Sequence, residues 1–154
     1  MKMTAHYLGP VLAILLWQSS AHAALGSDVR SVSIDRESMQ GQLQSTPMQQ
    51  YVLHEITTSG GTLVHEFETP QGKIFAVTWS GPFLPNLTQL FGSYYDQYRT
   101  ASAASAAAHP GMHRQITISQ PDFEMQALGR MRSFRGKAFV PSLVPSGVSV
   151  ADLR

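Results

Sequence analysis

Three short runs of β-forming residues follow one another between positions 51 and 79, and no other feature constrains the fold as strongly. The runs cover residues 51–57, 62–69 and 73–79, separated by Ser59-Gly60-Gly61 and Pro70-Gln71-Gly72. Alternating runs joined by such turn sequences are typical of antiparallel hairpins. The sequence therefore predicts a three-stranded antiparallel meander over these residues.

The turn at Pro70-Gln71-Gly72 also predicts a register. If Thr69 pairs with Lys73, strand alternation places Phe67 opposite Phe75 on one face. The same face then carries Leu63, His65, Val77 and Trp79. The other face, with Val64, Glu66 and Glu68, is expected to be the wetter one. We therefore expect one dry face on this sheet.

One amphipathic helix is predicted after the meander. Asn86 can cap its first turn, with Gln89 three residues later as in a capping box. Apolar side chains then recur at helical spacing at Leu87, Leu90, Phe91, Tyr94 and Tyr98. We expect this stripe to pack on the dry face, and His109-Pro110-Gly111 to end the helix.

Three more strand-like runs follow, over residues 115–119, 123–128 and 131–140. Strands before and after one main helix predict an α+β fold with an antiparallel sheet rather than a parallel βαβ fold. Residues 24–48 carry isolated hydrophobic side chains among polar ones, which predicts an extended arm with one short edge strand. The tail from Pro141 is predicted to be irregular.

The first 23 residues contain the three parts of a secretory signal peptide. Lys2 supplies the positive charge, residues 8–17 the apolar stretch, and Ala21-His22-Ala23 the small-x-small pattern before the cleavage site. The apolar stretch is too short to span a membrane, which takes about 20 residues. We expect cleavage after Ala23, one exported domain over residues 24–154, and no membrane span in the mature protein.

Charge and cysteine content argue against several classes of function. The chain has 11 Lys and Arg against 10 Asp and Glu, and the leader holds only Lys2 of these, so the mature chain carries 10 of each sign. A neutral chain lacks the basic surplus of a nonspecific nucleic-acid binder, so nucleic acid is not an expected partner. The chain has no cysteine, which excludes disulfides, thiol nucleophiles and thiolate metal sites. No nucleophile-elbow, P-loop or dinucleotide-binding motif occurs, and no cofactor is expected.

Two His-Glu dipeptides, His54-Glu55 and His65-Glu66, are the candidate residues for an enzyme or a metal site. Neither continues into the helical zinc motif H-E-x-x-H, because a threonine stands where the second histidine would be. A three-residue turn between the two strands pairs His54 with Glu66, whereas a two-residue turn pairs the two histidines, and the sequence fits both. In a purely structural interpretation of these dipeptides, His65 is hydrogen-bonded within the dry face and Glu66 is exposed to solvent. A hydrolase or metal-dependent enzyme that uses these four residues is the alternative function.

A basic stretch near the C-terminus is the candidate binding site. Four basic residues and one phenylalanine form it: Arg130, Arg132, Arg135, Lys137 and Phe134. Its structural interpretation is a solvated strand face whose charges pair with acids such as Glu124. Its functional interpretation is a site for an anionic partner, because guanidinium groups bind carboxylates and phosphates. We favour the second as a hypothesis.

Three segments carry a resemblance to a known family. They are Ala24-Leu25-Gly26, residues 79–87 (WSGPFLPNL) leading into 90–95 (LFGSYY), and residues 131–141 (MRSFRGKAFVP). With these segments the chain resembles the proteobacterial family called domain of unknown function 2844. The resemblance implies a Gram-negative periplasmic or secreted location and implies no activity. The sequence thus favours a non-enzymatic exported binding module, whose partner is an anionic envelope component or another exported protein.

Overall fold

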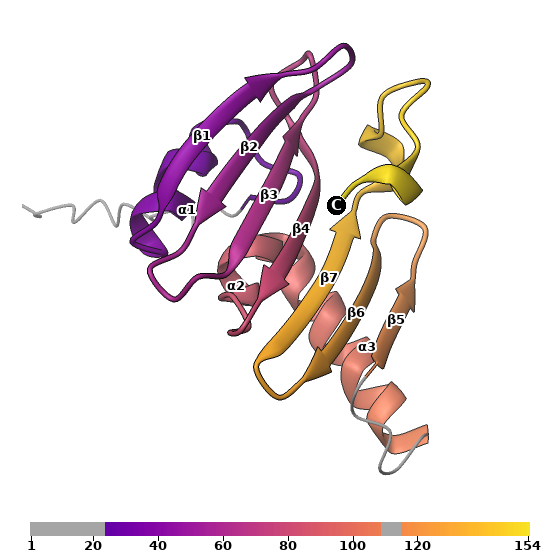
Figure 1. Ribbon diagram of the computed structural model, residues 1–154. Helices are drawn as coiled ribbons and strands as arrows, with labels where there is room; N and C mark the ends of the chain where they lie inside the picture. The colour runs from indigo at the N-terminus through magenta and orange to yellow at the C-terminus, as the bar shows by residue number, and fades with distance from the viewer. Residues whose placement is uncertain (1–23, 109–114) are drawn as a thin grey trace, which may run out of the picture.

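The computed structural model describes residues 24–108 and 115–154, and their strands form one open sheet. The predicted signal peptide and the predicted helix end at His109-Pro110-Gly111 lie outside these residues. The strands are β1 (Gln42–Pro47), β2 (Val52–Thr57), β3 (Leu63–Glu68), β4 (Ile74–Gly81), β5 (Gln115–Ser119), β6 (Glu124–Arg130) and β7 (Ser133–Phe139). Their order in the sheet is β1-β2-β3-β4-β7-β6-β5, and every neighbouring pair is antiparallel (Figure 1). The predicted α+β class with an antiparallel sheet is confirmed.

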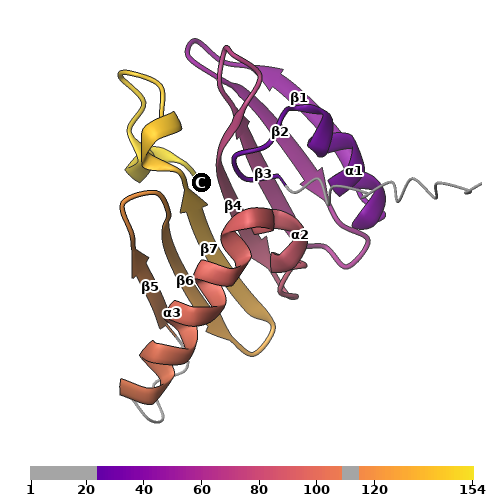
Figure 2. The same cartoon turned by 180° about the vertical axis from the view of Figure 1, so that it is seen from behind.

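The helices cover one face of this sheet (Figure 2). They are α1 (Arg30–Ser38), α2 (Leu87–Phe91), the 3-10 turn η1 (Gly92–Tyr94) and α3 (Tyr95–Ala108). Asn86 caps α2 as predicted, because its Oδ1 accepts a hydrogen bond from the main-chain N–H of Gln89 at 3.2 Å. The predicted single helix is divided at Gly92, whose φ of 48° interrupts the α-helical backbone.

The N-terminal arm is not extended as predicted, because its residues 30–38 form α1. This helix buries one apolar side chain, Val32, together with the polar side chains of Ser31 and Asp35. A helix that buries polar side chains has no apolar stripe, so the periodicity of the sequence did not indicate it. The predicted short edge strand is present as β1.

The β3–β4 hairpin keeps the predicted pairing only next to its turn. The main-chain N–H of Thr69 donates to the carbonyl of Lys73 at 2.7 Å, as expected. A β-bulge at Phe75 then adds one residue to β4, so that Phe67 pairs with Ala76 instead of Phe75. One extra residue moves every later side chain of β4 to the opposite face.

The bulge therefore changes which aromatic side chains the helices cover. Trp79 lies on the helix-covered face, where its ring centroid is 5.8 Å from that of Phe91 on α2. Leu90 and Phe91 are fully buried there, so the predicted apolar stripe is part of the core. The prediction that the helix packs on Phe67 and Phe75 is wrong, because these two side chains belong to a second apolar cluster.

This second cluster lies on the other face of the sheet, beneath the C-terminal tail. Phe67 and Phe75 pack there with the buried Leu153. The tail contains two short 3-10 helices, Pro141–Leu143 and Val150–Asp152, and is otherwise irregular, as predicted. In Figure 1 the tail lies beyond the upper end of β7 and beside β4, and it does not extend over the lower part of the sheet.

Candidate functional site

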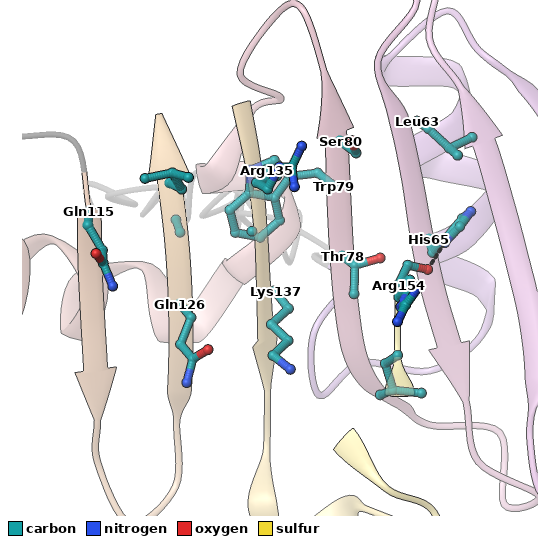
Figure 3. A pocket seen from close by; sticks show the side chains of 14 residues that line it. Leu63, His65, Thr78, Trp79, Ser80, Gln115, Gln126, Arg135, Lys137 and Arg154 are labelled. Atoms are coloured by element: carbon teal, nitrogen blue, oxygen red, sulfur yellow. Dashed lines mark hydrogen bonds between the residues drawn. The ribbon is translucent and has the colours of Figure 1, made fainter. Parts of the chain in front are cut away.

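An open groove of about 740 Å³ crosses the part of this face that the tail leaves uncovered. It runs over β5, β6, β7, β4 and β3, and the end of the tail borders it (Figure 3). Strand pairing arranges its side chains in two rows across the sheet. One row contains His65, Thr78, Lys137 and Gln126, and the other contains Leu63, Ser80, Arg135, Leu128 and Gln115.

The lining of the groove contains positively charged side chains and no acidic ones. Arg135 and Lys137 lie two residues apart on the central strand β7, so their Cα atoms are about 7 Å apart. Arg154, from the tail, lies beside β3 and β4 at the border of the groove (Figure 3). No Asp or Glu lines the groove, and neither Arg135 nor Lys137 forms an ion pair within residues 24–108 and 115–154. The groove therefore presents uncompensated positive charge.

Uncharged polar groups surround these cations. The Nζ of Lys137 donates to the main-chain carbonyl of Val150 at 3.0 Å, which ties the tail to the groove. An ammonium group has three donors, so two remain for a ligand. The hydroxyls of Thr78 and Ser80 and the amide of Gln126 provide further donors and acceptors. The groove can therefore bind a negatively charged group and hydrogen-bond to uncharged polar groups beside it.

His65 holds the edge of the groove in place. Its Nε2 lies 3.0 Å from the carboxylate of Glu55, and its Nδ1 forms a hydrogen bond with the main-chain oxygen of Arg154. Both partners offer acceptor oxygens to the ring. Because Glu55 lies on β2 and Arg154 in the tail, the ring links β2 to the end of the tail. This link keeps Arg154 beside the groove.

The five residues of the predicted basic site do not lie together, because successive residues of a strand point to opposite faces. Arg135 and Lys137 lie in the groove, whereas Phe134 points to the helix-covered face. Arg130 and Arg132 lie at the β6–β7 turn, outside the groove. Two of the five predicted residues therefore line this cavity. Its other charged group, Arg154, was not predicted, because only the folded tail brings it there.

The two candidate histidines lie on opposite faces of the sheet. The β2–β3 register pairs His54 with Glu66, which is the register of the three-residue turn. His54 Nδ1 lies 2.8 Å from the hydroxyl of Ser45, and its Nε2 lies 2.9 Å from the carboxylate of Glu68. His65 lies on the groove side, so the histidines do not share a site. In the described part of the chain, no group of three His, Asp or Glu side chains is arranged to hold a metal ion.

A buried pair of carboxyl groups, Asp35 and Glu66, lies between α1 and the sheet. Both residues have 0% of their surface exposed. The predicted solvated position of Glu66 is therefore wrong, because it lies on the face that the helices cover. Asp35 Oδ1 accepts a hydrogen bond from the side-chain amide of Gln89. Sequence reasoning missed this pair because it did not predict α1.

Burial and the contact between the two carboxyl groups shift the pKa of each. Burial raises the pKa of Asp35 to about 6. Burial and the negative charge of Asp35 raise the pKa of Glu66 well above its ordinary value. The remaining oxygens of the pair have no donor among the described N–H and O–H groups. Burial therefore favours the protonated form of Glu66, whose O–H can donate to a neighbouring oxygen of Asp35.

The fold and the groove define a class of protein, an α+β domain with one sheet face covered by helices and an open basic groove on the other. The chain belongs to the family described as Protein of unknown function (DUF2844), whose model matches residues 21–153. This match confirms the resemblance seen in the three sequence segments. Comparison with curated proteins and with solved structures gave no match. No helix in the described residues is long and apolar enough to cross a membrane.

Proposed function

We propose that this protein is an exported, non-enzymatic binding module that takes an extended anionic ligand in the groove. The observation that carries the proposal is the charge of the groove, where Arg135 and Lys137 have no acidic partner among the residues that the structure describes. Carboxylate and phosphate groups are the natural partners of such cations, and charge-assisted hydrogen bonds to them are stronger than neutral ones.

The form of the groove favours an extended ligand. Five neighbouring strands contribute to it, and at about 4.8 Å per strand the groove spans about 20 Å. The central cations occupy its middle, with hydroxyl and amide groups in the same rows and Leu63 and Leu128 in one of them. An acidic polysaccharide or an acidic peptide segment has this combination of charge, polar groups and length. An envelope component or another exported protein could supply either.

The test is a titration of residues 24–154 with polyglutamate, with polygalacturonate and with neutral dextran. We expect the two acidic polymers to bind and dextran not to bind. Arg135→Ala should weaken binding by about tenfold or more, because a hydrogen bond to a charged group contributes roughly 1.5–3 kcal/mol. Binding should also fall as salt rises, because salt screens exposed charges.

Arg99→Ala is the matched control. It removes the same charge from α3, where the Arg99 side chain is 72% exposed, and it should bind like the wild type. If Arg135→Ala binds both acidic polymers as tightly as wild type across the salt series, the groove is not the binding site.

A further inference from the structure

Three loops come together at one end of the sheet, at the lower ends of the strands in Figure 1. They are residues 58–62 between β2 and β3, residues 82–86 after β4, and the β6–β7 turn at Met131-Arg132. The pairing of β4 with both β3 and β7 places the end of β4 between the other two turns. We call these three loops the loop end.

The loop end exposes large apolar side chains. Met131 is 93% exposed, Phe83 56% and Leu84 50%, the highest values for large apolar residues in the part of the chain that the structure describes. Single exposed apolar side chains are normal on protein surfaces, whereas a group of them in one place indicates an interaction site.

The backbone that carries Phe83 is held firmly. The hydroxyl of the buried Thr62 donates to the carbonyl of Phe83 at 2.8 Å, and the N–H of Phe83 lies 3.2 Å from the same hydroxyl oxygen. The ring packs against Gly60, where an added Cβ would lie 3.0 Å from it. The fold therefore presents this ring from a defined position.

The charge of the loop end is also uncompensated. Arg130 and Arg132 are exposed on either side of Met131, and neither forms an ion pair with any described residue. None of the three loops contains an Asp or Glu. Arg132 has a φ of 58°, a left-handed conformation that favours glycine or asparagine. The chain thus keeps a cation at the tip of this turn although the backbone there favours another residue type.

We propose that the loop end docks on the surface of a bilayer that contains anionic lipids. Met131, Phe83 and Leu84 enter the interfacial layer, and the two arginines bind headgroup phosphates. Protruding loops with apolar tips and flanking arginines suit a soft interface that they can penetrate, since arginine keeps its charged end at the headgroups while its stem lies deeper. The attachment is peripheral and uses residues outside the groove.

The test is co-sedimentation of residues 24–154 with vesicles of phosphatidylcholine alone and of phosphatidylcholine mixed with phosphatidylglycerol. We expect binding to the mixed vesicles that falls as salt rises. Arg132→Gly suits the left-handed backbone and should weaken partitioning about fivefold, the contribution of one basic residue near an anionic surface. The double variant Phe83→Ser with Met131→Ser should lose most of the binding, because it removes two of the three apolar side chains that insert.

Control variants distinguish lipid binding at the loop end from lipid binding elsewhere on the protein. Met48→Ser alters an apolar residue that is 44% exposed at the opposite end of the sheet, and it should bind vesicles like wild type. Arg135→Ala should also bind like wild type; if it loses as much vesicle binding as Arg132→Gly, lipid binds in the groove and the proposal is wrong. Phe83→Trp should shift its fluorescence to shorter wavelength with mixed vesicles, whereas Met48→Trp should not. Equal binding to both vesicle types, or to neither, would also overturn the proposal.

Discussion

Asp35→Asn should change how the stability of this protein depends on pH, because it removes one member of the buried carboxyl pair. The asparagine amide keeps an oxygen that can accept from Gln89, and its NH₂ group can donate to Glu66. The substitution preserves the shape of the side chain. It replaces a carboxylate that repels Glu66 with a donor that stabilises the ionised form of Glu66.

The magnitude follows from the pKa of Asp35. Burial raises it from 3.8 to about 6 in the folded protein. A difference of this size corresponds to about 3 kcal/mol. Because the folded pKa is the higher one, the stabilising contribution is complete below pH 3.8 and is lost as the pH rises through about 6. The raised pKa of Glu66 acts in the same direction at higher pH. Wild-type protein should therefore lose on the order of 3 kcal/mol of stability through this pair between acidic and mildly alkaline pH.

Urea unfolding of wild type and Asp35→Asn near pH 4 and near pH 8 measures this loss. We expect the variant to be the more stable protein at the higher pH, by about 1–3 kcal/mol, and to lose this advantage at the lower pH. Glu37→Gln is the control, since it removes an exposed carboxyl group from the same helix. If the two proteins lose equal stability between these pH values, the carboxyl pair does not control the pH dependence, and the reasoning is refuted.

Two further predictions concern the core and the leader. Gly136→Ala should lower the free energy of unfolding by about 1–3 kcal/mol, because the added Cβ would lie 2.3 Å from the buried ring of Trp79. Gly129→Ala is the control: its nearest atom is 3.3 Å away, so it should lower the free energy of unfolding clearly less in the same urea melts. Equal losses of stability in the two variants would show that the Trp79 ring moves aside freely. If the leader is cleaved as proposed, the intact mass of the exported protein should correspond to a chain that begins at Ala24, and a soluble product that retains residues 1–23 would contradict export by this signal.

Much of the fold could be predicted because local signals agree with it. The turn at Pro70-Gln71-Gly72 and the alternation around it located two strands to within two residues, and Asn86 marked the start of α2. The bulge at Phe75 could not be predicted in this way. It lacks the glycine that often marks such an insertion, and both registers bury aromatic side chains.

The candidate site was predictable only in part, for a similar reason. Clustering of basic residues in the sequence pointed to β7, and strand alternation explains why Arg135 and Lys137 share a face that excludes Phe134. Arg154 reaches the groove through the tail, so no local pattern could place it there. Glu66 was assigned to solvent because the polar helix that buries it gives no apolar signal.

The single inserted residue at Phe75 connects the core to the proposed binding function. With the bulge, Trp79 faces the helices, and Thr78 and Ser80 stand on the open face between β3 and the cations of β7. Without it, Val77 and Trp79 would occupy the open face, and the middle of the groove would be apolar. The same insertion therefore gives the helices an aromatic side chain to pack on and places polar side chains in the middle of the groove. Stability and ligand binding depend on the same register, so a variant that removes the bulge should damage both together.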